Sequence, residues 1–371
     1  MRAYLDHNAT SPLRPEARDA MIAALDVCGN ASSVHAEGRA ARALIETARE
    51  DIARALGAIA PAVVFTSGGS ESCNQAIRGA GVDRIIVSAV EHPCVLEAAR
   101  ATGKPVSIAP VNGDGVIDLA ALDSLLADGE GRALISVMLA NNETGVIQPV
   151  RDVVALAQKH DALVHCDAVQ AFGKIPVNCA LLGVDLLSVS AHKLGGPQGV
   201  GALVIRDGLA VSPLIHGGGQ ELRRRAGTEN VAAIAGFAAA VKAAGETESD
   251  IKALRNQVES AIEQGPGKVT VFGKGVERLP NTVCFALPGL AADTALIAFD
   301  LEGIAVSSGS ACSSGKVAAS HVLKAMGAAE DAVASAIRVS LGWNTTDEDV
   351  NRFIESWQRI AGRHAAQAAA A

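Results

Sequence analysis

Short apolar runs alternate with amphipathic stretches along the first two thirds of the chain. Each apolar run ends in glycine or in small polar residues, which is the pattern of buried strands. The predicted strands cover residues 62–65, 84–88, 106–109, 133–139, 163–166, 186–189 and 200–205. The predicted helices cover residues 15–25, 33–56, 93–100, 119–127, 150–160, 230–244 and 251–263, and another helix opens at residues 71–76. This alternation predicts an α/β fold in which helices cover both faces of a mainly parallel sheet.

The pattern changes after Gly265-Pro266-Gly267, where strands and helices no longer alternate regularly. The strands predicted there cover residues 269–272, 282–286 and 337–341, and the helices cover 292–301, 320–325 and 346–361. We therefore predict a large domain over residues 16–264 and a smaller C-terminal α+β domain over residues 265–371. Residues 1–15 are predicted to associate with the small domain. The alanine-rich end, residues 365–371, is expected to fray.

Composition and charge exclude several classes of protein. The net charge of the 371-residue chain is −8 and no basic block is present, which argues against nucleic acid or an anionic membrane as the main partner. The N-terminus is too polar for a signal peptide, and the longest strongly apolar run, residues 231–241, is too short to span a bilayer. The seven cysteines are scattered and never spaced as Cys-x-x-Cys, so neither a disulfide framework nor a metal site is predicted. These features predict a cytoplasmic protein with reduced thiols.

Polar side chains follow several of the predicted strands. Lys193 comes directly after the strand that ends near Ser190, and the glycines and proline that follow it exclude a helix there. Taken singly, it could be an ordinary loop lysine. The other polar positions at strand ends are His92, Asn142, Asp167 and Gln170, which could individually be a turn histidine, a turn asparagine, a helix cap and a solvated glutamine. Because the carboxyl ends of parallel strands meet at one edge of a sheet, we expect these residues to lie together.

Their chemistry fits one cofactor. The junction Thr66-Ser67-Gly68-Gly69-Ser70 between a strand and a helix could be a plain tight turn, but its backbone N–H groups and helix dipole also favour a phosphate. A strand-end lysine can form a Schiff base, and Asp167 can keep a pyridine nitrogen protonated. His92 can stack on the ring, and the amide of Gln170 can bind a ring oxygen. Together these groups suit pyridoxal 5′-phosphate.

One cysteine stands apart from the other six. Cys312 lies in the serine- and glycine-rich segment Val306 to Gly315, which is predicted to be a mobile and exposed loop suited to a reactive thiol. The remaining cysteines lie among apolar or small residues and are interpreted as buried, inert thiols: Cys28, Cys73, Cys94, Cys166, Cys179 and Cys284.

The motifs, taken together and in this order, resemble those of the cysteine desulfurases of the NifS/IscS type. These belong to the class V aminotransferase-like enzymes, which have the pyridoxal-phosphate-dependent transferase fold type I. The resemblance covers nearly the whole chain. It is carried by Tyr4-Leu5-Asp6-x-Asn8-Ala9-Thr10, Thr66 to Ser72, Glu91-His92, Asn141-Asn142-Glu143-x-Gly145, Asp167-Ala168-x-Gln170, Ser190-x-His192-Lys193, His216 to Glu221, Arg225-x-Gly227-Thr228 and Ser307 to Cys312.

The resemblance implies a role for each matching residue. Lys193 would hold the cofactor as an internal aldimine, Asp167 would pair with the pyridine nitrogen, Gln170 with the ring hydroxyl, and His92 would stack on the ring. The residues implied for the phosphate are Gly69, Ser70, Ser190 and His192, with Thr228 reaching in from a second subunit. Those implied for the substrate carboxylate are Asn142 and Arg338, helped by Asn8. Cys312 would accept the sulfur. The chain departs from the family pattern at His7 and at Gly69-Ser70.

The activity implied is conversion of L-cysteine to L-alanine by a homodimer, with the sulfur held on Cys312 as a persulfide. A persulfide needs an acceptor, which would be an iron–sulfur scaffold, in nitrogenase or general cluster assembly, or another sulfur-acceptor protein. Alternatives are a selenocysteine lyase or an aminotransferase of the same fold, and a non-catalytic sulfur-assembly scaffold. An aminotransferase gives no reason for the Cys312 loop, and the presence of Lys193, Asp167 and Cys312 argues against a scaffold.

Overall fold

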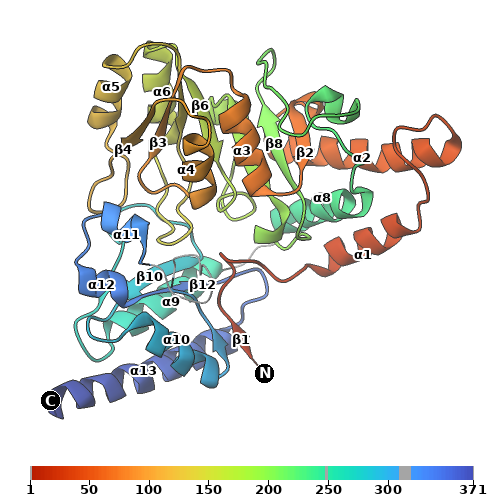
Figure 1. The fold of residues 1–371 in the computed structure, drawn as a ribbon. Coiled ribbons are helices and arrows are strands. Elements are labelled where there is room, and N and C mark those ends of the chain that lie inside the picture. Colours follow the sequence, from red (N-terminus) through yellow and green to blue (C-terminus); the bar gives the residue numbers. More distant parts are fainter. Residues whose placement is uncertain (1, 247–249, 309–318, 371) are drawn as a thin grey trace.

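A seven-stranded sheet forms the centre of the larger part of the molecule (Figure 1). The computed structural model describes residues 2–246, 250–308 and 319–370. The strand order is β2-β8-β7-β6-β5-β3-β4. The strands are β2 (Val63–Thr66), β3 (Arg84–Ser88), β4 (Val106–Ala109), β5 (Ala133–Ser136), β6 (Leu163–Asp167), β7 (Leu186–Ser190) and β8 (Gly201–Ile205). β8 alone runs in the direction opposite to the other six strands, which confirms the predicted mainly parallel sheet.

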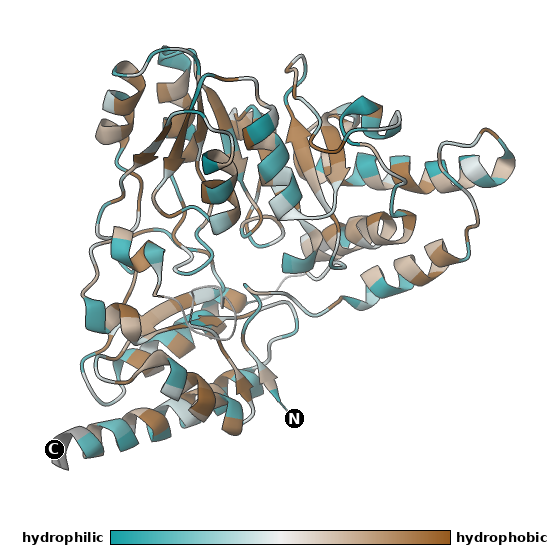
Figure 2. Ribbon diagram, in the orientation of Figure 1, coloured by the Kyte–Doolittle hydropathy of each residue, from teal (hydrophilic) through white to brown (hydrophobic). Residues whose placement is uncertain are grey.

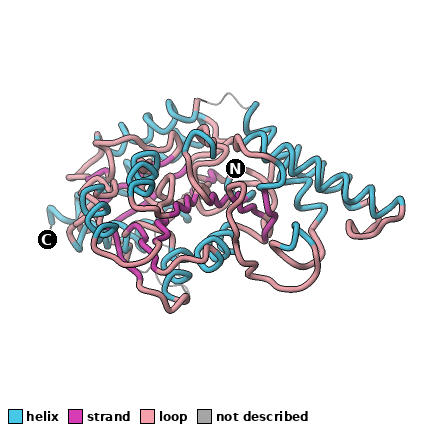
Figure 3. The backbone as a smooth tube through the Cα atoms, turned by 90° about the horizontal axis from the view of Figure 1, so that it is seen from above, coloured by secondary structure: helices cyan, strands magenta, loops and turns pink. Residues whose placement is uncertain are grey.

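Helices cover both faces of this sheet, because consecutive residues of each strand point to opposite sides (Figure 3). Ile85 and Leu134 pack in one apolar cluster with α3 (Gly69–Gly79) and α4 (Pro93–Arg100). Their neighbours Ile86 and Ile135 belong to the cluster on the other face. The helices that contribute to this second cluster are α1 (Pro15–Leu25), α2 (Ala36–Ala55), α5 (Leu119–Ala127), α6 (Val150–Lys159) and α8 (Val231–Glu246). Continuous apolar strands between amphipathic helices are visible in Figure 2.

The smaller part of the molecule has its own core. Its antiparallel sheet has the order β12-β10-β9, formed by β9 (Thr270–Val271), β10 (Thr282–Ala286) and β12 (Ala336–Ser340). The rings of Phe285 and Trp357 meet edge to face at 5.0 Å in this core. The helices are α9 (Ile251–Glu263), α10 (Ala292–Leu301), α11 (His321–Ala325), α12 (Glu330–Ala334) and α13 (Asp347–Ala370). The N-terminal strand β1 (Ala3–Tyr4) pairs in parallel with β11 (Ile304–Ala305), and Ala3 and Leu5 are buried in this core.

Some element boundaries differ from the sequence-based predictions. Helix α2 begins after His35, whose ring nitrogen accepts the N–H of Gly38, and not after Ser33. β5 ends at Ser136 instead of residue 139, since the N–H of Met138 turns to the carboxylate of Glu91. Helix α13 continues to Ala370, so the helix predicted to end at residue 361 is longer and includes alanine-rich residues after 364.

Helix α9 packs with the smaller part and not with the large sheet. Val258 and Ile262 belong to the same apolar cluster as Phe285 and Trp357. By packing, the division between the two parts therefore falls before Ile251 and not after residue 264. Within the described ranges, no helix is long and apolar enough to cross a membrane.

Candidate active site

The loops that follow β3, β5, β6 and β7 meet the small domain at one edge of the large sheet. They enclose a cleft of about 470 Å³. Eleven of the predicted site residues line it: Asn8, Gly69, Ser70, His92, Asn142, Asp167, Gln170, Ser190, His192, Lys193 and Arg338. The structure therefore brings together strand-end residues that are far apart in the sequence, as the parallel topology predicts.

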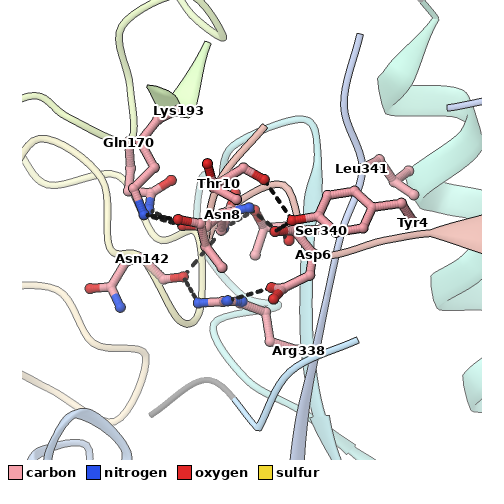
Figure 4. A network of polar contacts seen from close by, with 12 residues as sticks. Tyr4, Asp6, Asn8, Thr10, Asn142, Gln170, Lys193, Arg338, Ser340 and Leu341 are labelled. Atoms are coloured by element: carbon pink, nitrogen blue, oxygen red, sulfur yellow. Dashed lines mark hydrogen bonds and ion pairs between the residues drawn. The ribbon is translucent and has the colours of Figure 1, made fainter. Parts of the chain in front are cut away.

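Lys193 occupies the position expected for a reactive amine. It is the last residue of the short 3₁₀ turn Ala191–Lys193, which directly follows β7. Its Nζ donates to the backbone oxygens of Asn8, at 2.5 Å, and Ala9, at 2.9 Å (Figure 4). Burial lowers the pKa of Lys193 to about 8, and the positive charge of Arg338 acts in the same direction. An amine with this pKa is readily available in the neutral, nucleophilic form.

Asp167 ends β6 inside the sheet, and its Oδ1 accepts the N–H of Val169 at 2.9 Å. Burial raises the pKa of Asp167 to about 6, and the negative charge of the nearby Cys94 thiolate acts in the same direction. A buried carboxylate of this kind would be stabilised by a protonated ring nitrogen beside it. One turn further on, the Nε2 of Gln170 donates to the backbone oxygen of Asn8 at 2.9 Å.

His92 lies just before α4 and caps it. Its Nδ1 accepts the N–H of Cys94 at 3.1 Å. Burial by itself lowers the pKa of His92, but contacts with Cys94 and the charge of Asp167 raise it overall. The ring lines the cleft beside Asp167, where a flat group could stack on it.

The prediction that six cysteines are buried is wrong for three of them. Cys28 is exposed and Cys179 is partly exposed. Cys94 is also partly exposed and lines the cleft. Contact with the thiol of Cys73, and then the neighbouring His92, lower the pKa of Cys94 to about 5. The small and apolar residues next to Cys94 in the sequence suggested an inert thiol. They belong to the first turn of α4, where Cys94 faces the cleft.

A second cavity of about 470 Å³ adjoins the cleft and has the features of an anion site. The two cavities share Ala9, Gly69, Ser70, Ser190 and His192. Helix α3 begins here without a side-chain cap, so its N-terminal backbone donors are left for a ligand. The hydroxyl of Ser190 is buried and has no hydrogen-bond partner among the described residues. Burial lowers the pKa of His192 to about 4, which favours the neutral ring, whose Nδ1 lies 3.1 Å from the hydroxyl of Thr10.

Arg338 reaches the cleft from strand β12 of the small domain. Its guanidinium donates to the backbone oxygen of Asn142 at 2.9 Å and to the carboxylate of Asp6 at 2.7 Å (Figure 4). Asn8 is fixed on the same side, because its amide donates to the hydroxyl of Thr282 at 2.9 Å and to the Asn142 oxygen at 3.2 Å. The N-terminal segment thus contacts both the large and the small domain at the cleft.

Sequence reasoning missed three residues of this site. Asp6 holds Arg338 in place, Cys94 lines the cleft, and Lys174 donates to the side chains of Asn8 and Gln170. A signal was present for Asp6, which lies in the same motif as Asn8, and for Lys174, which follows Gln170 by four residues. Neither spacing by itself indicates a contact across the site.

One predicted site residue lies outside the cleft of this chain, and the position of another is not described. Thr228 lines a separate pocket with Phe65 and Glu221. Cys312 lies outside the described residues. The segment just before the undescribed range reaches the cleft, since Ser307 lines it and its N–H donates to the backbone oxygen of Arg338 at 3.1 Å. On the other side, the hydroxyl of Ser320 donates to the carboxylate of Glu143 at 2.5 Å.

Comparison with known proteins identifies the family. Residues 3–353 match the family described as Aminotransferase class-V. The cysteine desulfurase IscS of Dictyoglomus turgidum is 44% identical over 371 aligned residues, which cover 96% of this chain and 94% of that protein. The chain belongs to the class V aminotransferase family. Within this family its relatives are cysteine desulfurases of the IscS and NifS type, so the resemblance seen in the motifs is confirmed.

Solved structures of the family have the same fold. The NifS-like protein of Rickettsia africae superimposes with a TM-score of 0.91 at 38% identity, covering 98% of this chain and all of that one. SspA, solved in complex with cysteine, superimposes with a TM-score of 0.82 at 32% identity, covering 93% of this chain and all of that one. These likenesses confirm fold type I for this member of the class V aminotransferases, which are enzymes that use pyridoxal phosphate.

Proposed function

We propose that this protein is a pyridoxal-phosphate-dependent cysteine desulfurase that converts L-cysteine to L-alanine and passes the sulfur to an acceptor protein. The observation that carries the proposal is the junction of two cavities. One is lined by Lys193, Asp167 and His92, and the other by the uncapped start of α3 and the unpartnered hydroxyl of Ser190. The first cavity would take a ring that carries an aldehyde and a basic nitrogen, and the second would take the phosphate attached to that ring.

The residues present fit the cofactor. Gly69, Ser70, Ser190 and His192 would hold the phosphate, and the buried Ser190 hydroxyl would gain the partner that it lacks. Asp167 would pair with the protonated ring nitrogen, Gln170 would donate to the ring oxygen, and His92 would stack on the ring. The chemistry that pyridoxal phosphate supplies is an electron sink for bonds at the amino acid's Cα.

The chain's own groups carry out the remaining work. The neutral amine of Lys193, which the lowered pKa makes available, removes the proton from the substrate Cα. Arg338 binds the substrate carboxylate, and Asp6 and the Asn142 oxygen keep the guanidinium oriented. Asn142 and Asn8 are proposed to help at the same carboxylate.

The sulfur is proposed to leave the substrate for Cys312. The thiolate attacks the substrate sulfur, a sulfur–sulfur bond forms as the carbon–sulfur bond breaks, and protonation at carbon completes L-alanine. The outer sulfur of the Cys312 persulfide then passes to a thiol of an iron–sulfur scaffold or another acceptor protein in the reducing cytoplasm. A selenocysteine lyase would use the same cleft, but it would not require transfer of sulfur to a thiol of the enzyme.

Replacing Cys312 with alanine separates the two halves of this reaction. The variant should keep the visible absorption band of the bound cofactor, because none of the groups proposed to bind the ring or phosphate is changed. It should form almost no alanine from L-cysteine, because sulfur has no acceptor thiol. The matched control is Cys28→Ala, which removes an exposed cysteine elsewhere and should be as active as the wild type. Alanine formation at the wild-type rate by Cys312→Ala would refute the proposed role.

The protein is also proposed to act as a homodimer. Thr228 lies outside the cleft of its own chain, in the pocket beside Glu221, and would complete the phosphate site of a second subunit. Light scattering of the cofactor-loaded protein should therefore give twice the mass of the chain. A monomer with cofactor fully bound would contradict this proposal.

A further inference from the structure

Lys174 makes contacts that the proposed reaction leaves unexplained. It lies in the loop after Gln170 and lines a cavity of about 420 Å³, together with His7, Phe172, Lys193 and Trp343. From there its Nζ donates to the Oε1 of Gln170 at 2.7 Å and to the Oδ1 of Asn8 at 2.9 Å. Lys174 thus contacts the side chain of Gln170, which lines the cleft proposed to hold the cofactor.

These contacts determine which way the Gln170 carboxamide points. Its oxygen accepts from Lys174, and its nitrogen donates to the backbone oxygen of Asn8 at 2.9 Å. If the amide were reversed, its NH₂ would face another donor and its oxygen would face another acceptor. The nitrogen has a second hydrogen, and the side chain lines the cleft, so this hydrogen is available to a ring oxygen of a ligand.

Lys174 fixes Asn8 in the same way. The Oδ1 of Asn8 accepts from Lys174 and from Asn281, at 2.9 and 3.1 Å, while its amide hydrogens go to Thr282 and Asn142. The backbone oxygen of Asn8 accepts from both Gln170 and Lys193. The amine of Lys174 therefore links Asn8 of the N-terminal segment to Gln170, which would bind the ring oxygen of the cofactor.

The contacts do not depend on the charge of Lys174. Burial lowers its pKa well below the usual value, and the charges of Lys193 and Arg338 act in the same direction. A neutral amine still has two N–H bonds, which are enough for the two acceptors. The orientation of Gln170 is therefore maintained in either protonation state of Lys174.

We propose that Lys174 is a positioning residue that orients the carboxamide of Gln170, so that its NH₂ is directed at the ring oxygen of the cofactor. The inference rests on the proposed function, in which Gln170 binds that oxygen. Lys174 itself would touch neither the cofactor nor the substrate.

A double-mutant cycle tests this role. The variants are Lys174→Met, Gln170→Ala and the double variant, and the measurement is the affinity of each apoprotein for added pyridoxal phosphate. Each single change should weaken binding about tenfold, as expected for one lost hydrogen bond. Both should shift the absorption maximum of the bound cofactor in the same direction, because both remove the donor to the ring oxygen. The double variant should bind within about twofold of Gln170→Ala, because Lys174 acts through that side chain.

Two further variants separate positioning from packing. Lys174→Arg retains the donors and should recover most of the affinity. Lys174→Leu, which also lacks the donors, replaces Lys174→Met in the cycle if that variant does not fold. Lys252→Met is the matched control, since Lys252 lines the same cavity on α9 but is exposed, and it should leave both affinity and spectrum unchanged.

Different failures identify different errors. Additive losses in the cycle, or an unchanged absorption maximum in Lys174→Met, would overturn the positioning role while the proposed function stands. A wild-type apoprotein that binds no pyridoxal phosphate at all would overturn both.

Discussion

Replacing Lys193 with alanine should abolish turnover of L-cysteine and the covalent attachment of pyridoxal phosphate. Among the described residues, Lys193 is the only lysine that lines the cleft. We expect kcat to fall by about 10⁴-fold, which is the upper end of what one positioned proton-transfer group contributes. The measurement is borohydride reduction of the loaded protein followed by intact mass spectrometry, with alanine assayed in parallel.

The matched control for this variant is Lys242→Ala. Lys242 lies on α8 with an exposed side chain, and its partner Asp51 keeps an ion pair with Arg54, so the loss of Lys242 should change neither the mass of the adduct nor alanine formation. A borohydride-stable adduct in Lys193→Ala would show that another amine carries the cofactor.

The wild type should show the shifted pKa of Lys193 directly. A neutral amine is required for reaction with an aldehyde, so attachment of pyridoxal phosphate to the apoprotein should accelerate as the pH rises through about 8 and then level off. A lysine with the ordinary pKa of 10.5 would give a rate that continues to rise well above this pH.

Replacing Asp167 with asparagine should leave the fold and cofactor binding in place but remove most of the activity. The asparagine oxygen can still accept the N–H of Val169, so the turn after β6 keeps its hydrogen bond. The negative charge that would keep the ring nitrogen protonated is lost, and we expect kcat to fall by on the order of 10²–10³. The measurement is steady-state alanine production by protein of known cofactor content.

The control for this change is Asp185→Asn. Asp185 precedes β7 at the opposite edge of the same sheet, where its carboxylate accepts the N–H of Val164 at 2.7 Å. The same carboxylate pairs with Arg206 at 2.6 Å, so this variant loses a carboxylate at a strand end far from the cleft, and it should retain activity. Near-normal turnover by Asp167→Asn would mean that the carboxylate only caps the turn.

The parallel topology explains why much of the site could be predicted from the sequence. Asp167 ends a buried strand and His92, Asn142 and Lys193 follow others, and the carboxyl ends of parallel strands meet at one edge of the sheet. The glycine-rich start of α3 was equally predictable, since such a junction leaves backbone donors free. For these residues, the local pattern and the fold class were sufficient.

Contacts between distant segments could not be predicted in the same way. Asp6 and Arg338 are 332 residues apart, and their segments meet because the chain at Asp6 pairs in parallel with Ser340, at the end of β12. Lys174 reaches Asn8 across 166 residues, so its neighbours in the sequence give no indication of this contact. The amphipathic pattern of residues 251–263 predicted helix α9. It did not indicate that this helix packs with the core of the small domain and not with the large sheet.

The most direct test of the account is mass spectrometry of peptides from the wild-type protein after brief exposure to L-cysteine. The account predicts one added sulfur atom on the peptide that contains Cys312, with L-alanine released in equal amount. The thiols of Cys94 and Cys28 should stay unmodified, although both are partly or fully exposed. Sulfur found on Cys94 instead of Cys312, or alanine released without any added sulfur on the protein, would contradict the central claim.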